Sequence, residues 1–358
     1  MENLISVVII TYNQQNTIGR AINSVLTQKC HMPYEVVIGE DASTDGTRAI
    51  CQEYAKKYPN IIRLFCNERN KGITDNYFDC LLQCRGKYIA DCAGDDFWID
   101  PEKLEKELCV MEEHPNVTMV ITNWQFYNEQ TRKTFPSKQI RHLPITPGRN
   151  LIKAIITQKN MSVFHLCTAL YRTDVFRKTY EEDTYMFRSK DFCSEDMQIA
   201  SAMAWYGDIA YLPDITLNYS IGNSGVSNIN NSEKLFWFVW KSTILNKYLA
   251  SKYQIDIREF LSERFFELGM HAFRSHQRSL YEETLSCELA WQVEKNKKYK
   301  LLMAIMRHEG LWRITLAIRR IVVSLKRRVC RTAFLTSVQQ PLEKLSAKPP
   351  VTATGQRL

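Results

Sequence analysis

Short apolar runs alternate with segments of helical spacing over roughly the first third of the chain. Five runs rich in apolar and β-branched residues have the length of a buried strand: 5–10, 34–39, 61–66, 87–92 and 117–121. Between these runs, apolar residues recur three or four positions apart, as at Ile18, Ile22 and Val25. Repeated strand–helix units of this size predict a parallel sheet with helices on both faces, and therefore a Rossmann-like α/β domain.

The pattern changes after about Ser232, where helical spacing continues but aromatic and basic residues become frequent. From about Gln339 the chain contains Pro, Ser and Thr without apolar periodicity, which is typical of a disordered tail. We therefore expect three parts: an α/β domain at 1–225, a helical, basic C-terminal region at 226–335, and a disordered tail at 336–358.

Polar residues follow three of the predicted strands. In parallel sheets covered by helices, ligands bind beyond the carboxyl ends of the strands. The groups found there are Thr11-Tyr12-Asn13, Glu40-Asp41 and Gly94-Asp95-Asp96. We expect these groups to lie at one edge of the sheet and to line the ligand site.

The chemistry of these groups favours a metal-dependent site. The chain contains neither Gly-x-x-x-x-Gly-Lys nor Gly-x-Gly-x-x-Gly, so a phosphate-binding loop of either kind is not supported. Carboxylates hold a diphosphate only when a divalent cation lies between the like charges. Asp95 and Asp96 are suited to bind Mg²⁺ or Mn²⁺, although a solvated turn or a helix cap before Pro101 would use the same residues.

Three segments at the start of the chain resemble family 2 glycosyltransferases: Val7-Val-Ile-Ile-Thr-Tyr-Asn13, Ala21-Ile-Asn-Ser-Val-Leu-Thr-Gln28 and Glu40-Asp-Ala-Ser-Thr-Asp-Gly-Thr47. Gly94-Asp-Asp-Phe-Trp98 resembles the metal-binding segment of that family, and Ser194-Glu-Asp-Met-Gln198 resembles the segment with its catalytic base. The resemblance covers about residues 4–225. It implies the A-type glycosyltransferase fold (GT-A), here with a C-terminal helical extension.

The resemblance also implies roles for residues of a nucleotide site. Tyr12 resembles the residue that packs on the nucleobase, and Thr11 and Asn13 belong to the same strand-end loop. Asp41 resembles the carboxylate that accepts a hydrogen bond from the base. Asn76 resembles the asparagine that opens a helix near the nucleotide. The ordinary alternatives are strand-end, cap and helix-start positions.

Four carboxylates carry the implied chemistry. Asp95 resembles the principal residue for the metal or the diphosphate, with Asp96 beside it. Asp196 resembles the general base, with Glu195 as its neighbour; the alternative is the solvated start of a helix. The implied reaction is a single displacement, in which an acceptor hydroxyl attacks the anomeric carbon of a nucleotide-sugar and inverts it.

Three departures from the family pattern concern the donor site. Ala93 stands where the family has the first carboxylate of Asp-x-Asp-Asp, Glu40 stands where an aspartate is more frequent, and Asn218-Tyr-Ser-Ile221 replaces Tyr-Arg-x-His. Ala93 motivates an alternative, a catalytically inactive relative that binds a sugar or nucleotide. A nucleotidyltransferase is a second alternative, but the residues after the first strand lack its glycine-rich basic loop.

The charge distribution points to an anionic partner for the C-terminal part. Residues 223–358 contain 23 Lys and Arg against 11 Asp and Glu, whereas the preceding residues contain 24 and 28. An apolar stripe from Leu311 to Leu325 is flanked by Arg and Lys, which is typical of a helix in an anionic membrane interface. The stripe could instead pack on the catalytic domain. We expect a membrane surface to contact 311–331, and no nucleic acid.

The remaining expectations concern partners and compartment. By family resemblance, the donor is a UDP-sugar and the acceptor is a glycan or lipid-linked hydroxyl. The 11 cysteines include no Cys-x-x-Cys, the nearest pair being Cys80 and Cys84, so reduced thiols are favoured over zinc sites or disulfides. The N-terminus lacks the basic segment of a signal peptide. We expect a cytoplasmic protein that binds peripherally to the inner membrane face.

Overall fold

The computed structural model describes residues 1–137, 144–158, 165–222 and 231–322. The chain divides into two compact units, Met1–Arg264 and the residues from Phe265 onward. Each unit is described by itself. Helix α9, Ser232–Lys252, lies within the first unit. The boundary that the sequence predicts near residue 225 stays a prediction.

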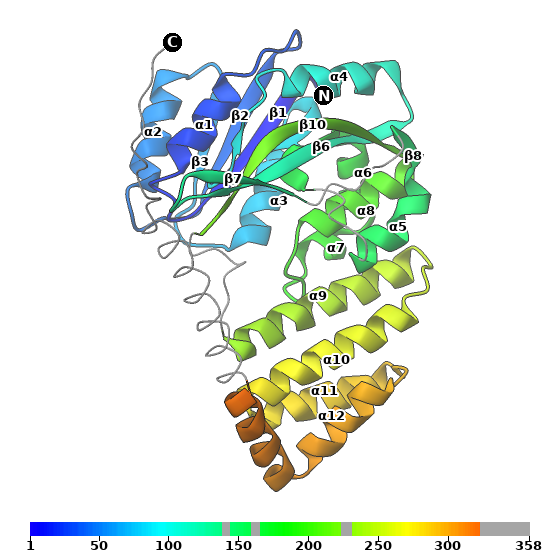
Figure 1. Ribbon diagram of the computed structural model, residues 1–358. Helices are drawn as coiled ribbons and strands as arrows, with labels where there is room; N and C mark the ends of the chain where they lie inside the picture. Colours follow the sequence, from blue (N-terminus) through cyan, green and yellow to red (C-terminus); the bar gives the residue numbers. More distant parts are fainter. Residues whose placement is uncertain (138–143, 159–164, 223–230, 323–358) are drawn as a thin grey trace, which may run out of the picture. The chain divides into compact units, whose positions relative to one another are not determined.

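A ten-stranded sheet forms the centre of the first unit (Figure 1). Its strands are β1 Glu2–Thr11, β2 Tyr34–Glu40, β3 Ile62–Cys66, β4 Gly86–Asp91, β5 Phe97–Trp98, β6 Val117–Asn128, β7 Lys133–Pro136, β8 Ile145–Pro147, β9 Ala169–Arg172 and β10 Asp208–Ile221. The order across the sheet is β3-β2-β1-β4-β9-β6-β10-β5, with β7 beside β6 and β8 beside β10.

The predicted parallel arrangement is confirmed for most of the sheet. Strands β3, β2, β1 and β4 are parallel neighbours, and β6 is parallel to β10. Strand β9, however, is antiparallel to both β4 and β6. Its four residues are too few to produce a recognisable periodicity, so sequence patterns did not indicate a reversed strand in the middle of the sheet.

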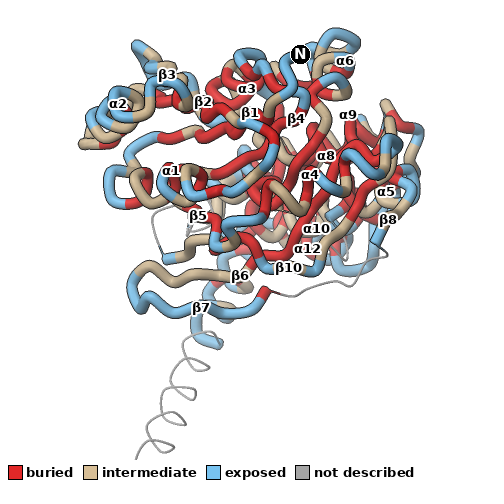
Figure 2. Tube along the Cα trace, turned by 90° about the horizontal axis from the view of Figure 1, so that it is seen from above, coloured by how far each residue is buried: buried red, intermediate tan, exposed pale blue. Residues whose placement is uncertain are grey.

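Helices cover both faces of the sheet, as the alternation of strand and helix signals predicts. Helices α1 Ile18–Leu26, α2 Thr47–Lys57 and α4 Lys103–Glu113 pack on one face; α3 Ile73–Gln83, α6 Thr173–Glu182 and α8 Asp196–Tyr206 pack on the other. Helices α5 Gly148–Thr157 and α7 Thr184–Arg188 complete this side. The buried segments follow the sheet and the inner sides of these helices (Figure 2).

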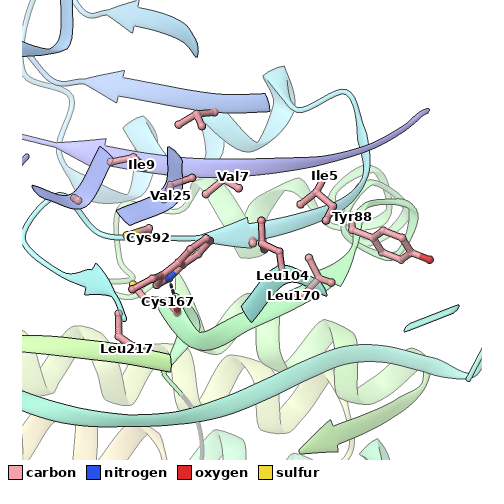
Figure 3. Close-up of a cluster of buried hydrophobic side chains, with 14 of the residues drawn as sticks. Ile5, Val7, Ile9, Val25, Tyr88, Cys92, Leu104, Cys167, Leu170 and Leu217 are labelled. Carbon is pink, nitrogen blue, oxygen red and sulfur yellow. Dashed lines mark hydrogen bonds between the residues drawn. The ribbon is translucent and has the colours of Figure 1, made fainter. Parts of the chain in front are cut away.

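Alternate residues of β1 form the core beneath α1, α2 and α4. Ile5, Val7 and Ile9 point to this face and are fully buried with Tyr88 of β4 and Leu104 of α4 (Figure 3). The strands of this region are buried on both faces, which explains their nearly continuous apolar sequences. The core therefore fixes the strand ends at which the polar groups lie.

The second unit contains the remaining helices. Helix α10 Arg258–Ser275 leads into it, followed by α11 Arg278–Ala290, α12 Lys297–Arg307 and a helical segment at 309–322. In this last segment Trp312 is fully buried, donates from Nε1 to the carbonyl oxygen of Phe273 (3.0 Å) and packs against Phe273, His276 and Tyr281.

The opposite side of the 309–322 helix is apolar and exposed. Its exposed large apolar residues are Leu311, Ile314, Ile318, Ile321 and Val322. Between Leu311 and Val322, the predicted apolar stripe thus does not pack on the core of its own unit. Leu325 and the cations at 326–331 lie outside the described residues. Within the described part of the chain, helices long and apolar enough to cross a membrane do not occur.

A buried ion pair in α4 offers a test of the core. Lys103 Nζ lies 2.7 Å from Glu107 Oε2, both side chains are fully buried, and the ammonium lies 4.4 Å from the centre of the Trp98 ring. Burial raises the pKa of Glu107 to about 7, against the attraction of Lys103. Replacing Lys103 by Met would leave a buried carboxylate without its cation, and we expect this to destabilise the domain by about 3–5 kcal/mol.

Urea unfolding followed by tryptophan fluorescence measures this change. The double variant Lys103→Met, Glu107→Leu is the matched control, because it removes both charges and should regain most of the stability. A single variant as stable as the wild type would show that this pair does not stabilise the core.

Candidate active site

A cavity of about 630 Å³ lies beyond the carboxyl ends of the strands. It is lined by the end of β1, by Asp41 after β2, by the start of α3, by the loop after β4 and by Glu195. Segments that are far apart in the sequence thus meet where the strand pattern predicts.

The loop after β4 is closely packed against the end of β1. A Cβ atom on Gly94 would lie 2.3 Å from Gln14 Oε1 and 2.9 Å from Thr11 Oγ1. Thr11 is buried and donates from Oγ1 to Gln14 Oε1 (2.8 Å), while Thr17 donates from Oγ1 to the Gly94 carbonyl oxygen (2.9 Å). The absence of a side chain at Gly94 therefore allows the close approach that places Asp95 at the cavity.

Asn13, in the loop after β1, adopts an unusual backbone conformation and connects two loops by hydrogen bonds. Its backbone is left-handed (φ 53°), and its Oδ1 accepts a hydrogen bond from the Thr44 amide (2.8 Å). Its own amide donates to Ser43 Oγ (3.0 Å). Asn13 thereby ties the loop after β1 to the loop after β2. The neighbouring Tyr12 is 44% exposed and lines the cavity, so its ring is available to a ligand.

Asp41 organises the opposite wall of the cavity. Its Oδ1 accepts hydrogen bonds from Asn67 Nδ2 and from the Lys71 amide, and its Oδ2 accepts one from the Gly72 amide, each at 2.9 Å. Gly72 has a φ of 85°, a conformation that favours glycine. The carboxylate therefore holds the loop before α3, and one oxygen retains capacity for a further donor.

Asn76 is buried and bonded within the protein. Its Nδ2 donates to the Gly39 carbonyl oxygen and its Oδ1 accepts from Asn67 Nδ2, both at 2.9 Å. Asn67 thus bridges Asn76 and Asp41. These bonds attach the first turn of α3 to the end of β2, and Asn76 contributes to the floor of the cavity.

Asp95 and Asp96 face different surroundings. Asp95 is half-buried and lines the cavity, and burial raises the pKa of its carboxyl. Asp96 is buried and accepts a hydrogen bond at Oδ1 from the Ser220 amide of β10 (2.9 Å). Burial and the charge of Asp95 raise the pKa of Asp96 strongly. Of the two predicted metal ligands, Asp95 is the one that a ligand in the cavity would meet.

The guanidinium group of Arg20 stabilises the Asp95 turn. Arg20 Nη2 donates to the Asp95 carbonyl oxygen (3.1 Å) and to Ser220 Oγ (3.2 Å), and the group is ion-paired with Glu129. Its carbon Cζ lies 4.1 Å from the centre of the Phe97 ring. Arg20 does not line the cavity; it joins the turn to the ends of β6 and β10.

Asp91, the last residue of β4, does not line the cavity. It is buried beside the hydroxyl groups of Tyr77 and Tyr171, which lie 3.1 Å apart. Burial raises the pKa of Asp91 to about 7, although both tyrosines favour the charged form. Asp91 therefore does not replace the carboxylate that is missing at Ala93, which itself lines the cavity.

Glu195 and Asp196 stand at the start of α8. Glu195 precedes the helix and lines the cavity. Asp196 is the first residue of the helix and is half-buried. Burial raises the pKa of both carboxyls, that of Asp196 to about 6, and the charge of Asp196 raises the pKa of Glu195 further. A carboxylate with a pKa near neutrality, close to a polar cavity, has the properties of a general base.

Comparison of the sequence with known proteins indicates the class of enzyme that this chain resembles. The model named "Glycosyl transferase family 2" matches residues 6–180. The putative glycosyltransferase EpsE of Bacillus subtilis is 34% identical over 143 residues, 40% of this chain and 49% of EpsE. The Escherichia coli enzyme named UDP-Glc:alpha-D-GlcNAc-diphosphoundecaprenol beta-1,3-glucosyltransferase WfgD is 28% identical over 190 residues, 52% of this chain and 69% of WfgD.

A solved structure extends the likeness to the fold. The crystal structure of S. aureus TarS 1-349 in complex with UDP-GlcNAc superposes with a TM-score of 0.51 at 17% identity, covering 85% of this chain and 91% of that one. Residues 6–180 thus match the family 2 glycosyltransferase model, and the chain has the GT-A fold. It spans about a third to a half of the length of the first curated relatives that it matches.

Three residues of the site were missed from the sequence: Gln14, Arg20 and Asn67. Asn67 directly follows β3, so the rule that selects strand ends would have included it. Gln14 and Arg20 follow β1 in a loop and a helix, where no local pattern separates them from ordinary polar positions. Their contacts to the Asp95 turn depend on the fold.

The packing at Gly94 yields a prediction. In Gly94→Ala the new methyl group would displace Gln14, which hydrogen-bonds with Thr11 and lowers the pKa of Asp95. We expect the affinity for a nucleotide diphosphate with Mn²⁺ to fall by about tenfold or more, which is about 1.4 kcal/mol or more. Calorimetric titration measures the affinity.

Gly19→Ala provides the matched control, because a Cβ atom there would meet other atoms at ordinary distances of 3.6 Å and beyond. It should bind the nucleotide as the wild type does. Equal affinities of the Gly94→Ala variant and the wild type would mean that the close packing of this turn is unimportant for the ligand.

Proposed function

We propose that this protein is an inverting glycosyltransferase that moves a sugar from a nucleotide diphosphate donor, a UDP-sugar, to a hydroxyl of a glycan or lipid-linked acceptor. The observation that carries the proposal is the convergence of Asp41, Asp95 and Glu195 on one cavity, with Asp196 beside it. A nucleotide-sugar needs these functions together: recognition of the base, neutralisation of the diphosphate and a base for the acceptor.

The nucleotide would occupy the part of the cavity between Tyr12 and Asp41. The exposed ring of Tyr12 can stack on a nucleobase, and Asp41 Oδ2 can accept a hydrogen bond from an N–H of the base. TarS was solved with UDP-GlcNAc and WfgD is named for UDP-Glc, and both names support a UDP-sugar as the donor here.

A divalent cation, Mn²⁺ or Mg²⁺, fits the donor end of the cavity. Asp95 offers a hard oxygen ligand that is half-buried and free of an ion pair to Arg20, whose guanidinium bonds to the Asp95 carbonyl oxygen instead. The ion would neutralise charge on the departing diphosphate. Because Ala93 stands in place of a carboxylate, Asp95 would supply most of the negative charge that the protein offers to the ion. Asp96 attaches the turn to β10 through the Ser220 amide.

Asp196 is the proposed general base. In a single displacement it accepts the proton of the acceptor hydroxyl while the oxygen attacks the anomeric carbon from the side opposite the diphosphate, which inverts that centre. Its raised pKa makes it a stronger base than an ordinary aspartate. Glu195, which lines the cavity, is the alternative base, and the variants below separate the two.

An anionic membrane surface is the proposed location of the acceptor. The exposed face of the 309–322 helix carries five large apolar side chains, and Arg313, Arg319 and Arg320 lie on the same helix. Cations near such a surface contribute about 1 kcal/mol each. The name of WfgD specifies a diphosphoundecaprenol acceptor, a lipid, which supports a membrane-bound acceptor here.

The first test concerns the base. Asp196→Asn preserves size but cannot accept the proton, so we expect turnover of the donor to fall by about 10²–10⁴-fold while donor binding remains. Release of UDP from UDP-sugars in the presence of Mn²⁺ measures turnover. Glu195→Gln is the companion variant; if it alone abolishes turnover, the base is Glu195. If the wild type binds donors but never turns them over, the protein is an inactive relative.

The same residue sets the pH dependence. A general base must be ionised, and its raised pKa means that activity is lost as the pH falls through about 6. An aspartate of ordinary pKa would stay active down to about pH 4. A profile of kcat/KM against pH measures the midpoint in the free enzyme, and a midpoint near 4 would contradict the assignment.

A further prediction concerns the metal. In Asp95→Ala the enhancement of nucleotide diphosphate binding by Mn²⁺ should be lost, because the carboxylate that faces the cavity is gone. Asp91→Asn is the control: this carboxylate is buried away from the cavity and should not affect the enhancement. Calorimetry with and without Mn²⁺ compares the three proteins, and metal-independent binding in all of them would refute the metal site.

The membrane surface is tested by sedimentation with vesicles. The full chain should bind vesicles containing anionic lipid at low salt and be released at high salt. Replacing Ile314 and Ile318 by Ser should weaken binding by about tenfold or more, given the apolar area lost. Leu289→Ser, which removes an exposed apolar residue elsewhere in the second unit, is the control. Binding that ignores lipid charge and both isoleucines would disprove this surface.

A further inference from the structure

A cluster of cysteine, histidine and glutamate side chains that could hold a metal ion lies on the surface of the first unit, apart from the residues that line the cavity. The loop between α1 and β2 contributes Cys30 and His31, and helix α4 contributes Glu105, Cys109 and Glu112. We call these five residues the α4 cluster. The three residues of α4 lie at i, i+4 and i+7 and therefore share one face of the helix.

The ligand atoms of three residues in the α4 cluster are close enough to share one ion. The ligand atoms of Cys30, His31 and Glu105 all lie within 4.8 Å of one another, and His31 Nδ1 is 3.0 Å from each Glu105 oxygen. Cys109, which is not one of these three residues, has its Sγ 3.8 Å from Glu105 Oε1. Tetrahedral zinc with Zn–S of about 2.3 Å and Zn–N of about 2.0 Å separates its ligands by about 3–4 Å.

We propose that the α4 cluster binds one Zn²⁺ ion through four side chains: Cys30, His31, Glu105 and Cys109. Two thiolates, an imidazole and a carboxylate are a donor set that zinc prefers over Mg²⁺ or Mn²⁺. The set differs in kind from the carboxylates proposed for the catalytic metal. The proposal does not depend on the function assigned to the cavity.

Glu112 adds a feature typical of zinc sites. With Nδ1 of His31 bound to the ion, Nε2 carries the proton, and it lies 3.5 Å from Glu112 Oε2. Metal-bound histidines usually donate their second N–H to a carboxylate or carbonyl, which fixes the tautomer and the ring orientation. An ion pair between His31 and Glu105 alone would leave the placement of the two thiols and of Glu112 unexplained.

The site would strengthen a contact that the protein already makes. Next to Cys30, the Lys29 amide donates to the Pro101 carbonyl oxygen (2.8 Å), and Gln28 Nε2 donates to that of Asp100 (2.7 Å). The Leu104 amide donates to Gln28 Oε1 (3.1 Å). A zinc ion would therefore fasten the α1–β2 loop to α4, directly after the segment that begins with the Asp95 turn.

Cobalt substitution tests the site on the full chain, reduced and freed of metal with a chelator. We expect one Co²⁺ to bind with the intense visible bands of a tetrahedral site and a thiolate-to-cobalt charge-transfer band in the near ultraviolet. Zn²⁺ should displace it. Cys30→Ser and Cys109→Ser should each weaken the charge-transfer band, and Glu112→Gln should lower the affinity by about 10–100-fold.

Three control variants locate the bands. Cys66→Ser removes an exposed thiol elsewhere, Asp95→Ala alters the catalytic candidate, and Cys167→Ser removes the thiol of the buried group Asp96, His165 and Cys167. All three should keep the cobalt spectrum. The proposal is overturned if the wild type gives no thiolate band, or if Cys167→Ser abolishes the band while Cys30→Ser and Cys109→Ser keep it.

Alkylation of the wild type gives a second measurement that needs no variant. Bound Zn²⁺ should protect Cys30 and Cys109 from iodoacetamide, while Cys66 should react equally with and without zinc. Mass spectrometry of peptides reads the modification at each cysteine. Equal labelling of Cys30 and Cys109 with and without Zn²⁺ would refute the site.

Discussion

The turn after β4 can form only if its glycine lies against β1, and the candidate site depends on this contact. Gly94 lies against Thr11 and Gln14, and a larger residue there would collide with both side chains and displace Gln14. From this point the chain presents Asp95 to the cavity and directs Asp96 inward to the amide of Ser220. Two adjacent aspartates thereby acquire different surroundings, one accessible to a ligand and one structural.

The site concentrates negative charge in a partly desolvated region. Burial raises the pKa of Asp91, Asp95 and Asp196, and like charges raise that of Asp96 and Glu195 further. Such a group of carboxylates is costly without a compensating cation. The described cation nearest to the Asp95 turn, Arg20, is already engaged with Glu129 and the backbone. The proposed divalent ion would supply the positive charge that these carboxylates lack.

The sequence was most informative where local chemistry and fold position coincide. The run Ile5–Ile10 specifies a buried strand, and a strand buried on both faces ends at a predictable edge, so Thr11, Asp41 and Asp95 could be assigned to one site. The reversed strand β9 and the contacts of Arg20 could not be predicted in this way. Strand β9 depends on pairing with β4 and β6, and Arg20 contacts Ser220, which is about two hundred residues away along the chain.

The proposed zinc site illustrates the same limit for cysteines. A search for Cys-x-x-Cys assumes that the ligands are neighbours in sequence, whereas Cys30 lies beside Glu105 only because α4 packs beside the α1–β2 loop. Asn13 and Asn76 both line the cavity, but their side chains are largely occupied by hydrogen bonds within the protein. Their roles toward a nucleotide stay predictions.

The hydrogen bonds of Asp41 also bear on how donor preference could diversify or be engineered. Because this carboxylate holds the amides of Lys71 and Gly72 as well as Asn67, it cannot be exchanged without loss of the wall that it supports. Selection for a different nucleobase would therefore act more readily on side chains that line the cavity without bracing it, such as Tyr12. Conservation of an acidic residue at position 41 among related proteins would then reflect its structural role in the cavity wall, whichever nucleobase binds there.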